Sequence, residues 1–330
     1  LKAILTQREY RKEPDYTAIH HYLTLQYVPA PLTGFKNIKK LEPAHYLFLN
    51  TKTGELEKQR YWKLDYSKKL HISEKEWGKR IIEKLEESIK LRMISDVPIG
   101  AFLSGGIDSS AIVALMSKHS SQPVKTFSIG FQEKKFNELP YARKVASQFK
   151  TDHTEFIVKP DTIEVLPQLI RQYEEPYADS SQVPTYYLSK LTREHVTVAL
   201  NGDGGDENFA GYGRYSIQKF VLWYDKLLPL HKITALPVSQ VLRHYVKNTF
   251  TERASRFSTT VIENYAKRYV NYLCYFTNSQ KNNLYTREFS AQMKHQNSYD
   301  IVADKFAEAA TPDKLDQTLY ADVATYLPDD

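Results

Sequence analysis

The sequence predicts an α/β fold in which helices cover both faces of a parallel sheet. Short apolar, β-rich runs alternate with amphipathic segments of helix length from residue 72 to residue 200, a pattern typical of parallel sheets. Two of these runs, at 98–103 and 196–200, lead directly into glycine-rich loops that carry serine and acidic residues. Beyond Gly213 the chain is expected to be helical and rich in tyrosine. Prolines are expected to separate these helices, at Pro229, Pro237 and Pro312.

The first sixty or so residues are expected to form a smaller, incomplete piece. Residues 16–26 have the apolar spacing of a helix. Residues 41–49 and 56–64 are typical of two strands, and the turn residues at 50–54 join them into a hairpin. A two-stranded hairpin is only marginally stable alone. Its apolar face therefore needs a partner layer, which leaves a homodimer open.

The main part of the fold is expected to follow a polar linker at 65–75. A helix begins at Ser73, with Glu76 three residues on in the position of a capping box. One apolar face of this helix is expected to be buried, with Trp77, Ile81, Ile82, Leu85, Ile89 and Leu91. The next elements are predicted as strand 98–103, helix 109–118, strand 124–131, helix 140–149, strand 153–158, helices 161–173 and 183–194, and strand 196–200.

Composition and charge narrow the class of protein. The net charge of +6 over 330 residues is dispersed in isolated lysine pairs, so no nucleic-acid surface is expected. No apolar run reaches the roughly 18 residues that a membrane helix needs, so no membrane partner is expected. Cys274 is the only cysteine. Its apolar neighbours predict a buried structural thiol, and the lack of a cysteine pair favours a reducing, cytoplasmic location.

The most informative motif is Ser104–Ser110, SGGIDSS, which lies between a predicted strand and a predicted helix. Glycines permit a tight turn, and the helix N-terminus beyond it directs backbone N–H groups at one point, which suits an anion. Asp108 would repel a phosphate there unless a cation lay between them, so Mg²⁺ is implied. The motif is neither a dinucleotide fingerprint nor a Walker A loop. We interpret it as a site for the polyphosphate of a nucleotide.

A second loop, Asn201–Glu207, follows the apolar run at 196–200 and has the sequence NGDGGDE. Its three acids in five residues call for a counter-ion. Ligands of open α/β sheets gather at the carboxyl ends of the strands. We therefore expect Asp108 and Asp206 to hold Mg²⁺, with ATP oxygens completing its shell. For either loop taken alone, an ordinary surface turn is the alternative.

Together these motifs resemble the asparagine synthetase family of the PP-loop ATP pyrophosphatase superfamily. Ser104–Ser110 is similar to the pyrophosphate-binding loop, and Asn201–Tyr212, NGDGGDENFAGY, to the second signature of the family. Two further segments, at 136–143 and 174–184, are similar to the stretches between these signatures. The resemblance implies a parallel-sheet domain of the adenine nucleotide alpha hydrolase-like class, followed by C-terminal helices.

The resemblance also implies how the chain is divided. Residues 1–64 are similar to the tail of an Ntn-type glutaminase domain, 65–75 form a linker, and 76–330 correspond to the synthetase domain. Residue 1 is leucine rather than the cysteine that such a glutaminase uses, so glutamine hydrolysis by this chain is not expected. The family places a phosphate-neutralising lysine shortly after Leu327–Asp330. A chain that stops there is expected to bind Mg·ATP but to adenylate poorly or not at all.

The implied reaction joins aspartate and ammonia into asparagine, with ATP converted to AMP and pyrophosphate. Asp203 is the candidate general base, although a metal or capping role for it and a role for Glu207 stay open. Asn201 stands where the family more often has serine. ATP or pyrophosphate is expected to contact Phe102, Leu103, Ser104, Gly105, Gly106, Asp108, Ser109, Ile129, Asn201 and Gly202.

Other interpretations stay open at this point. The same architecture would serve a related amidotransferase or cyclase that acts on a β-lactam, peptide, sugar or polymer precursor, or a nucleotide-binding relic without catalysis. The segment 174–181 could line the substrate site or only cap the next helix, through Ser180 or Ser181. The charged loop at 132–138 could be a lid or a plain surface loop.

Overall fold

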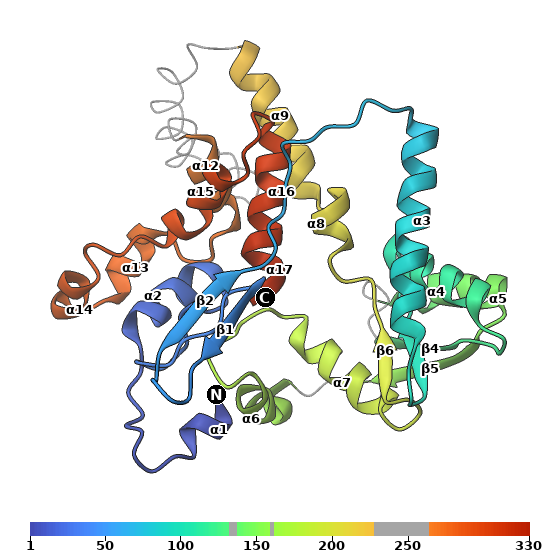
Figure 1. Cartoon of the computed structure of the whole chain (residues 1–330), viewed down its shortest axis with the longest axis horizontal. Coiled ribbons are helices and arrows are strands. Elements are labelled where there is room, and N and C mark those ends of the chain that lie inside the picture. The colour runs from blue at the N-terminus through green and yellow to red at the C-terminus, as the bar shows by residue number, and fades with distance from the viewer. Residues whose placement is uncertain (132–136, 159–161, 228–263) are drawn as a thin grey trace, which may run out of the picture. The chain divides into compact units, whose positions relative to one another are not determined.

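A computed structural model describes residues 1–131, 137–158, 162–227 and 264–330 (Figure 1). Most of the loop expected at 132–138, and the breaks expected at Pro229 and Pro237, lie outside these residues. The chain divides into two compact units. We call the one formed by 69–172 and 180–205 the sheet unit, and the one formed by 1–68, 173–179 and 206–330 the helical unit.

The sheet unit contains a four-stranded parallel sheet in the order β5-β4-β3-β6, which confirms the predicted fold class. The strands are β3 (Ile99–Phe102), β4 (Lys125–Phe131), β5 (Asp152–Val158) and β6 (Val198–Leu200). From β3 the chain passes to β4 and then to β5 on one side, and it returns to place β6 on the other side of β3. The direction of winding therefore reverses between β3 and β6.

Five helices accompany this sheet among the residues that the structure describes: α3 (Glu74–Met93), α4 (Ile107–His119), α5 (Leu139–Phe149), α6 (Thr162–Tyr173) and α7 (Gln182–Thr192). The core between sheet and helices combines apolar side chains from α3, α4, α5, β3 and their flanking loops. They are Ile89, Ala101, Leu103, Val113, Met116, Val124, Ala142 and Ala146. Burial of such side chains contributes roughly 1.5–3 kcal/mol for each of the larger ones.

The predicted start of α3 is confirmed, but its predicted buried face is largely wrong. Ser73 Oγ accepts the Glu76 N–H at 3.2 Å, as an N-cap should. Only Ile89 is buried, whereas Trp77, Ile82 and Leu91 are exposed. The helix is 20 residues long, and one end of it stands clear of the sheet (Figure 1). The apolar residues of α3 therefore repeat at the helical period along the whole helix, although only part of the helix packs against the rest of the sheet unit.

The helical unit joins the two ends of the chain in one core. Its helices are α1 (Lys2–Leu5), α2 (Tyr16–Leu25), α8 (Gly205–Phe209), α9 (Gly213–Leu227), α12 (Tyr265–Leu273), α13 (Asn278–Leu284), α14 (Arg287–Gln292), α15 (Ser298–Glu308), α16 (Lys314–Ala324) and α17 (Tyr326–Asp329). Leu25 and Tyr27 near the N-terminus pack in a cluster with Tyr269, Val302 and Phe306. Cys274 is buried in the same cluster, which confirms the structural thiol.

A second buried region of the helical unit is polar and centres on Lys281, whose exposed fraction is 1%. Its ammonium contacts His20 Nε2 at 3.0 Å and Ser298 Oγ at 2.9 Å. His21 Nδ1 lies 3.0 Å from the same serine oxygen, and Tyr285 Oη lies 3.1 Å from His20 Nδ1. Burial lowers the pKa of Lys281 to about 8 and, with the nearby Lys281 charge adding to it, the pKa of each histidine to about 4. Both imidazoles are therefore neutral at pH 7.

The predicted hairpin forms from β1 (His45–Leu49) and β2 (Leu56–Arg60), with Leu49 opposite Leu56. Asn50 Oδ1 accepts the Lys52 N–H in the turn between them. The apolar side chains of both strands are exposed, and Phe48 exposes 60% of its surface. The partner layer that the sequence calls for is thus not among the described residues.

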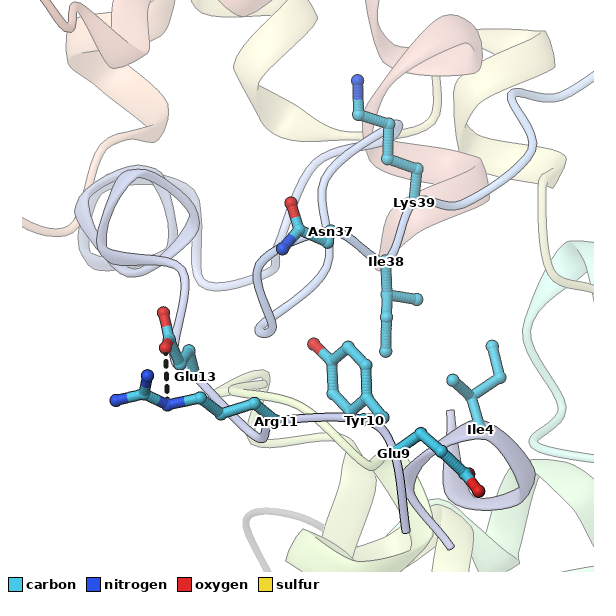
Figure 2. A pocket seen from close by; sticks show the side chains of 8 residues that line it. All are labelled: Ile4, Glu9, Tyr10, Arg11, Glu13, Asn37, Ile38 and Lys39. Carbon is cyan, nitrogen blue, oxygen red and sulfur yellow. Dashed lines mark ion pairs between the residues drawn. The ribbon is translucent and has the colours of Figure 1, made fainter. Parts of the chain in front are cut away.

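The N-terminal segment of the helical unit also encloses a hollow of about 590 Å³, drawn in Figure 2. It is lined by Ile4, Glu9, Tyr10, Arg11, Glu13, Asn37, Ile38 and Lys39. Arg11 Nε pairs with Glu13 Oε1 at 2.8 Å on its rim. None of the residues predicted to bind nucleotide lines this hollow. In the described part of the chain, every helix is too short or too polar to cross a membrane.

Candidate nucleotide site

The two motif loops lie at the same edge of the sheet, next to each other. Ala101 of β3 pairs with Leu200 of β6 in parallel register, so both strands end at the same level. The loop at 104–109 follows β3, and the loop at 201–205 follows β6. This edge is where the winding reverses, and open α/β sheets bind their ligands in the crevice at that reversal. The topology therefore places both loops where a ligand would bind.

The loop after β3 is held by hydrogen bonds between its two serines. Ser104 Oγ lies 2.9 Å from Ser109 Oγ and accepts the Gly106 N–H at 3.1 Å. Gly106 is the N-cap of α4 and has no side chain with which to cap it. The N–H groups of the first turn thus stay available at the positive end of the helix. A phosphate is the ligand that such an arrangement favours.

Gly105 is the residue that makes the tight turn possible. Its φ is +84°, in the left-handed region that side chains disfavour. A Cβ at this position would lie 2.5 Å from the Tyr141 carbonyl carbon and 2.6 Å from the Ala142 nitrogen. The backbone of α5 therefore packs directly on the loop, and this close contact fixes where the loop lies.

Asp108 is the meeting point of the two loops. A Cβ on Gly202 would lie 2.9 Å from Asp108 Cβ and 2.9 Å from the Ser109 nitrogen. A Cβ on Gly205 would lie 2.6 Å from Asp108 Oδ1. Glycine at both positions lets the second loop approach the Asp108 carboxylate closely. The expected convergence of the 104–109 and 201–205 loops is thus observed within the sheet unit.

A metal ion at this point would need ligands beyond the protein. Asp108 lies half-buried in the first turn of α4 and presents oxygen atoms, the donors that Mg²⁺ prefers. Asp206 follows Gly205 directly in the chain and begins the last segment of the helical unit. No three His, Cys, Asp or Glu side chains form a ready metal site within the described ranges. Asp108 alone, within the sheet unit, fits Mg²⁺, which usually binds one or two carboxylates together with substrate phosphates and water.

The carboxylates of the second loop differ in their surroundings. Asp203 is exposed, and its N–H donates to Asn201 Oδ1 at 3.3 Å while the Asn201 amide donates to its carboxylate. Glu207 is buried and accepts the Tyr212 hydroxyl at 2.8 Å. Burial and this carboxylate raise the pKa of Tyr212. The Asp203 side chain is therefore exposed to solvent, whereas Glu207 is engaged inside the helical unit.

The predicted nucleotide contacts from the strands have different settings. Phe102 ends β3 and Ile129 lies near the end of β4, and both side chains are half-buried. The Leu103 side chain belongs to the core, and its N–H donates to the Phe127 carbonyl at 2.9 Å. Ser128 Oγ donates to the Leu103 carbonyl. Leu103 thus anchors the strand end, and Ser128 is a support that sequence motifs did not single out.

The segment at 174–181 is used in two ways. Glu174 pairs with Lys2, and Glu175 Oε2 accepts the Gly34 N–H at 3.0 Å, so both acids contact the N-terminal segment of the helical unit. Ser181 is the N-cap of α7, but its side chain makes no capping hydrogen bond. Ser181 therefore occupies the predicted capping position without a capping hydrogen bond from its side chain. A role of this segment in the substrate site stays a prediction. No periodicity or motif indicated the contacts of the two acids, which join residues far apart in the sequence.

Comparison with known proteins agrees with this geometry. Residues 80–330 match the asparagine synthase family. The chain belongs to this family. Residues 1–62 match a second family, the glutamine amidotransferase domain. Both signature loops at the carboxyl edge of the sheet lie within the first of these matches.

Two curated relatives carry related names. One, from Bacillus subtilis, is a glutamine-hydrolysing asparagine synthetase that is 30% identical over 324 residues, 96% of this chain and 48% of the relative. Another, from Methanocaldococcus jannaschii, is provisionally named as an enzyme of the same kind and is 41% identical over 218 residues, 64% of this chain and 42% of the relative. The chain thus spans less than half the length of either relative.

Proposed function

We propose that this chain carries the nucleotide site of an enzyme that makes asparagine from aspartate and ammonia through an acyl-adenylate. The observation that carries the proposal is the convergence of two glycine-rich loops on Asp108 at the reversal point of the sheet. Membership of the asparagine synthase family supports the choice of reaction. So do the names of the curated relatives.

In the first step a carboxylate oxygen of aspartate attacks the α-phosphorus of ATP. The bond from that phosphorus to the bridging oxygen breaks, and pyrophosphate leaves with the electron pair. The loop at 104–109 would bind the leaving pyrophosphate through its N–H groups and through the hydroxyls of Ser104 and Ser109. These donors are already ordered by their own hydrogen bonds. Positioning and charge stabilisation of this kind supply most of the catalysis in phosphoryl chemistry.

Asp108 and Asp206 would hold Mg²⁺, which when bound neutralises charge on the phosphate oxygens. Phe102 and Ile129 would bind the adenosine, beside Asn201 and Gly202. The half-buried side chains of Phe102 and Ile129, at the strand ends, offer the apolar surface that a nucleoside base requires.

In the second step ammonia attacks the acyl carbon, the bond from that carbon to AMP breaks, and a proton must leave the new amide nitrogen. We propose Asp203 as the group that accepts this proton. Its exposure and its contact with Asn201 leave the carboxylate accessible, whereas Glu207 is buried and bonded to Tyr212. A general base must be able to reach the proton that it takes.

Exchange of labelled pyrophosphate into ATP, driven by aspartate and Mg²⁺ and measured on a version of the chain extended to the full length of its relatives, tests the first step. Asp108→Asn should lower the exchange rate about 100-fold, equivalent to about 3 kcal/mol of transition-state stabilisation. The exposed Asp96 in the same unit provides the matched control, and Asp96→Asn should leave the rate unchanged. Mg·ATP affinity measured by calorimetry separates loss of binding from loss of chemistry.

Other outcomes identify other functions. Exchange driven by a different carboxylate, but not by aspartate, would assign the chain to the related amidotransferases or cyclases. Binding of Mg·ATP by the extended version with no exchange for any acid would indicate a nucleotide-binding relic. No binding of Mg·ATP at all would refute the site itself. Whether a homodimer forms through the exposed hairpin stays a prediction, which light scattering on the chain can check.

A further inference from the structure

Lys40 connects three segments of the helical unit. Its ammonium donates to the Val28 carbonyl at 2.6 Å and to Glu175 Oε1 at 2.7 Å. Asp329 Oδ1 lies 3.7 Å away. The Lys40 side chain is only 27% exposed, and those of Glu175 and Asp329 are 13% and 8% exposed. Partial burial of these charges distinguishes the cluster from an ordinary surface ion pair.

Backbone groups of the segment 28–40 complete the cluster. The second oxygen of Glu175 accepts the Gly34 N–H at 3.0 Å, and the second oxygen of Asp329 accepts the Ala30 N–H at 2.9 Å. A Cβ on Gly34 would lie 3.1 Å from Pro176 Cδ, so the segment packs closely on this proline. Each carboxylate is therefore shared between Lys40 and a backbone N–H of the same segment.

The segment at 173–179 is attached to the N-terminal part of the chain at a second point. The Ala178 N–H donates to the Gln26 carbonyl at 2.9 Å, and the Gln26 side-chain amide donates to the Ala178 carbonyl at 3.1 Å. These bonds fix the far end of the segment. Lys40 and Gly34 then fix its beginning at Glu175.

The balance of charge in this cluster depends on Lys40. Burial raises the pKa of the Asp329 carboxyl, the Ala30 N–H and Lys40 lower it, and the Glu175 charge raises it. Without Lys40, the largely buried carboxylates of Glu175 and Asp329 would repel each other and would lose the cation that they share. Removing one partner of such a buried charge cluster leaves the other charges uncompensated.

We propose that Lys40 is a positioning residue through which the segment matched to the amidotransferase family holds two segments of the synthase match in place. These are 173–179 and 326–330, each of which carries one of the two carboxylates. Lys40 thus keeps both segments conformationally ordered, and only the consequence of this for catalysis rests on the proposed function.

Hydrogen exchange on the whole chain without nucleotide tests the proposal. Lys40→Met should speed amide exchange about tenfold or more in both segments. Lys39→Met removes the same charge one residue away, from an exposed side chain, and should leave both segments as protected as in the wild type. Lys40→Arg keeps the charge and should restore most of the protection.

A pH profile distinguishes positioning by charge from simple loss of packing. Because burial raises the pKa of the Asp329 carboxyl, this group loses its charge, and with it the repulsion that Lys40→Met uncovers, as the pH falls. The loss of protection in Lys40→Met, relative to the wild type at the same pH, should therefore be greatest near pH 8 and shrink toward acid pH. If Lys40→Met does not fold, Glu175→Gln provides the second test, since it retains an acceptor for Gly34. Glu175→Gln should speed amide exchange at 173–179 and leave 326–330 protected, because Asp329 still accepts the Ala30 N–H.

Wild-type protection of both segments in Lys40→Met, or equal losses in the Lys39 and Lys40 variants, would overturn the proposal. A loss of protection that does not change with pH would also overturn it, because packing alone would then explain the effect. Failure of pyrophosphate exchange in the extended wild-type version, with both segments protected, would count against the proposed function and not against this role of Lys40.

Discussion

Replacement of Gly105 by alanine is the sharpest test of how the phosphate loop is built. The left-handed backbone at φ +84° costs an alanine about 1–2 kcal/mol. Its Cβ would also lie 2.5 Å from the Tyr141 carbonyl carbon, and such overpacking adds roughly 1–3 kcal/mol. Because the obstructing atoms are backbone atoms of α5, no side-chain rotation can relieve the contact. We expect Gly105→Ala to lower the free energy of unfolding by about 2–5 kcal/mol in total.

Gly78→Ala is the matched control, since it makes the same chemical change in the same unit. Nothing lies within 4 Å of a Cβ at Gly78, which is in α3 and lacks the left-handed φ. Alanine should therefore stabilise the helix by about 1 kcal/mol. The two substitutions are expected to change the free energy of unfolding in opposite directions.

Chemical denaturation measures the free energy of unfolding, and calorimetry measures the affinity for Mg·ATP. If α5 holds the loop in its binding shape, Gly105→Ala should weaken Mg·ATP binding at least tenfold, and Gly78→Ala should not change it. A Gly105→Ala chain with the wild-type unfolding free energy and nucleotide affinity would refute the reasoning. It would mean that the loop can move away from α5 without cost.

Two further predictions concern the helical unit. Because burial lowers the pKa of His20 and His21 from 6.5 to about 4, the unfolded state binds more protons between these values. Stability should therefore fall by about 3 kcal/mol for each histidine as the pH drops from 6.5 to 4, as chemical denaturation across that range can show. Asp322 accepts a hydrogen bond from buried Arg214 at 2.9 Å. Asp322→Asn should therefore lower the free energy of unfolding by about 3–5 kcal/mol, and the same substitution at Asp316, on the same helix, should lower it by less.

The fold and the outline of the nucleotide site could be predicted because their signals are local. A parallel strand buried on both faces is a short, nearly continuous apolar run, and the runs at 98–103 and 196–200 are each followed by a glycine-rich loop. The pattern of strands and helices alone does not give the strand order. It was the strand order, with β3 next to β6, that brought the two loops together.

Helix boundaries and faces were harder to predict. The helix expected at 109–118 begins two residues earlier, at Ile107, with Gly106 as its N-cap. Asp108, near the end of the 104–109 loop, consequently lies in the first turn of the helix. In α3 the apolar period is present, but a period does not indicate how much of a helix has a partner to pack against.

Contacts between distant parts of the sequence left no local signal at all. Lys281 lies in a polar stretch, NSQKNNL, that is typical of a solvated helix, yet it is buried against His20. Lys40 lies beside Lys39 in the sequence, and only the structure shows that Lys40 is half-buried and paired with Glu175 while Lys39 is exposed. Composition and periodicity report the average surroundings of a residue, whereas such pairs depend on which segments meet.

The boundary between the two family matches in the sequence is therefore not a boundary in the packing of the chain. Residues 1–62 match the amidotransferase family, yet Leu25 and Tyr27 share a core with Tyr269 and Phe306 from the synthase match. Lys40 adds charge to that contact by holding the Glu175 carboxylate. A segment of one family thus supplies apolar and ionic support to another. The sheet unit begins at Lys69, inside the predicted linker 65–75, whereas the contacts of residues 1–62 reach as far as Phe306.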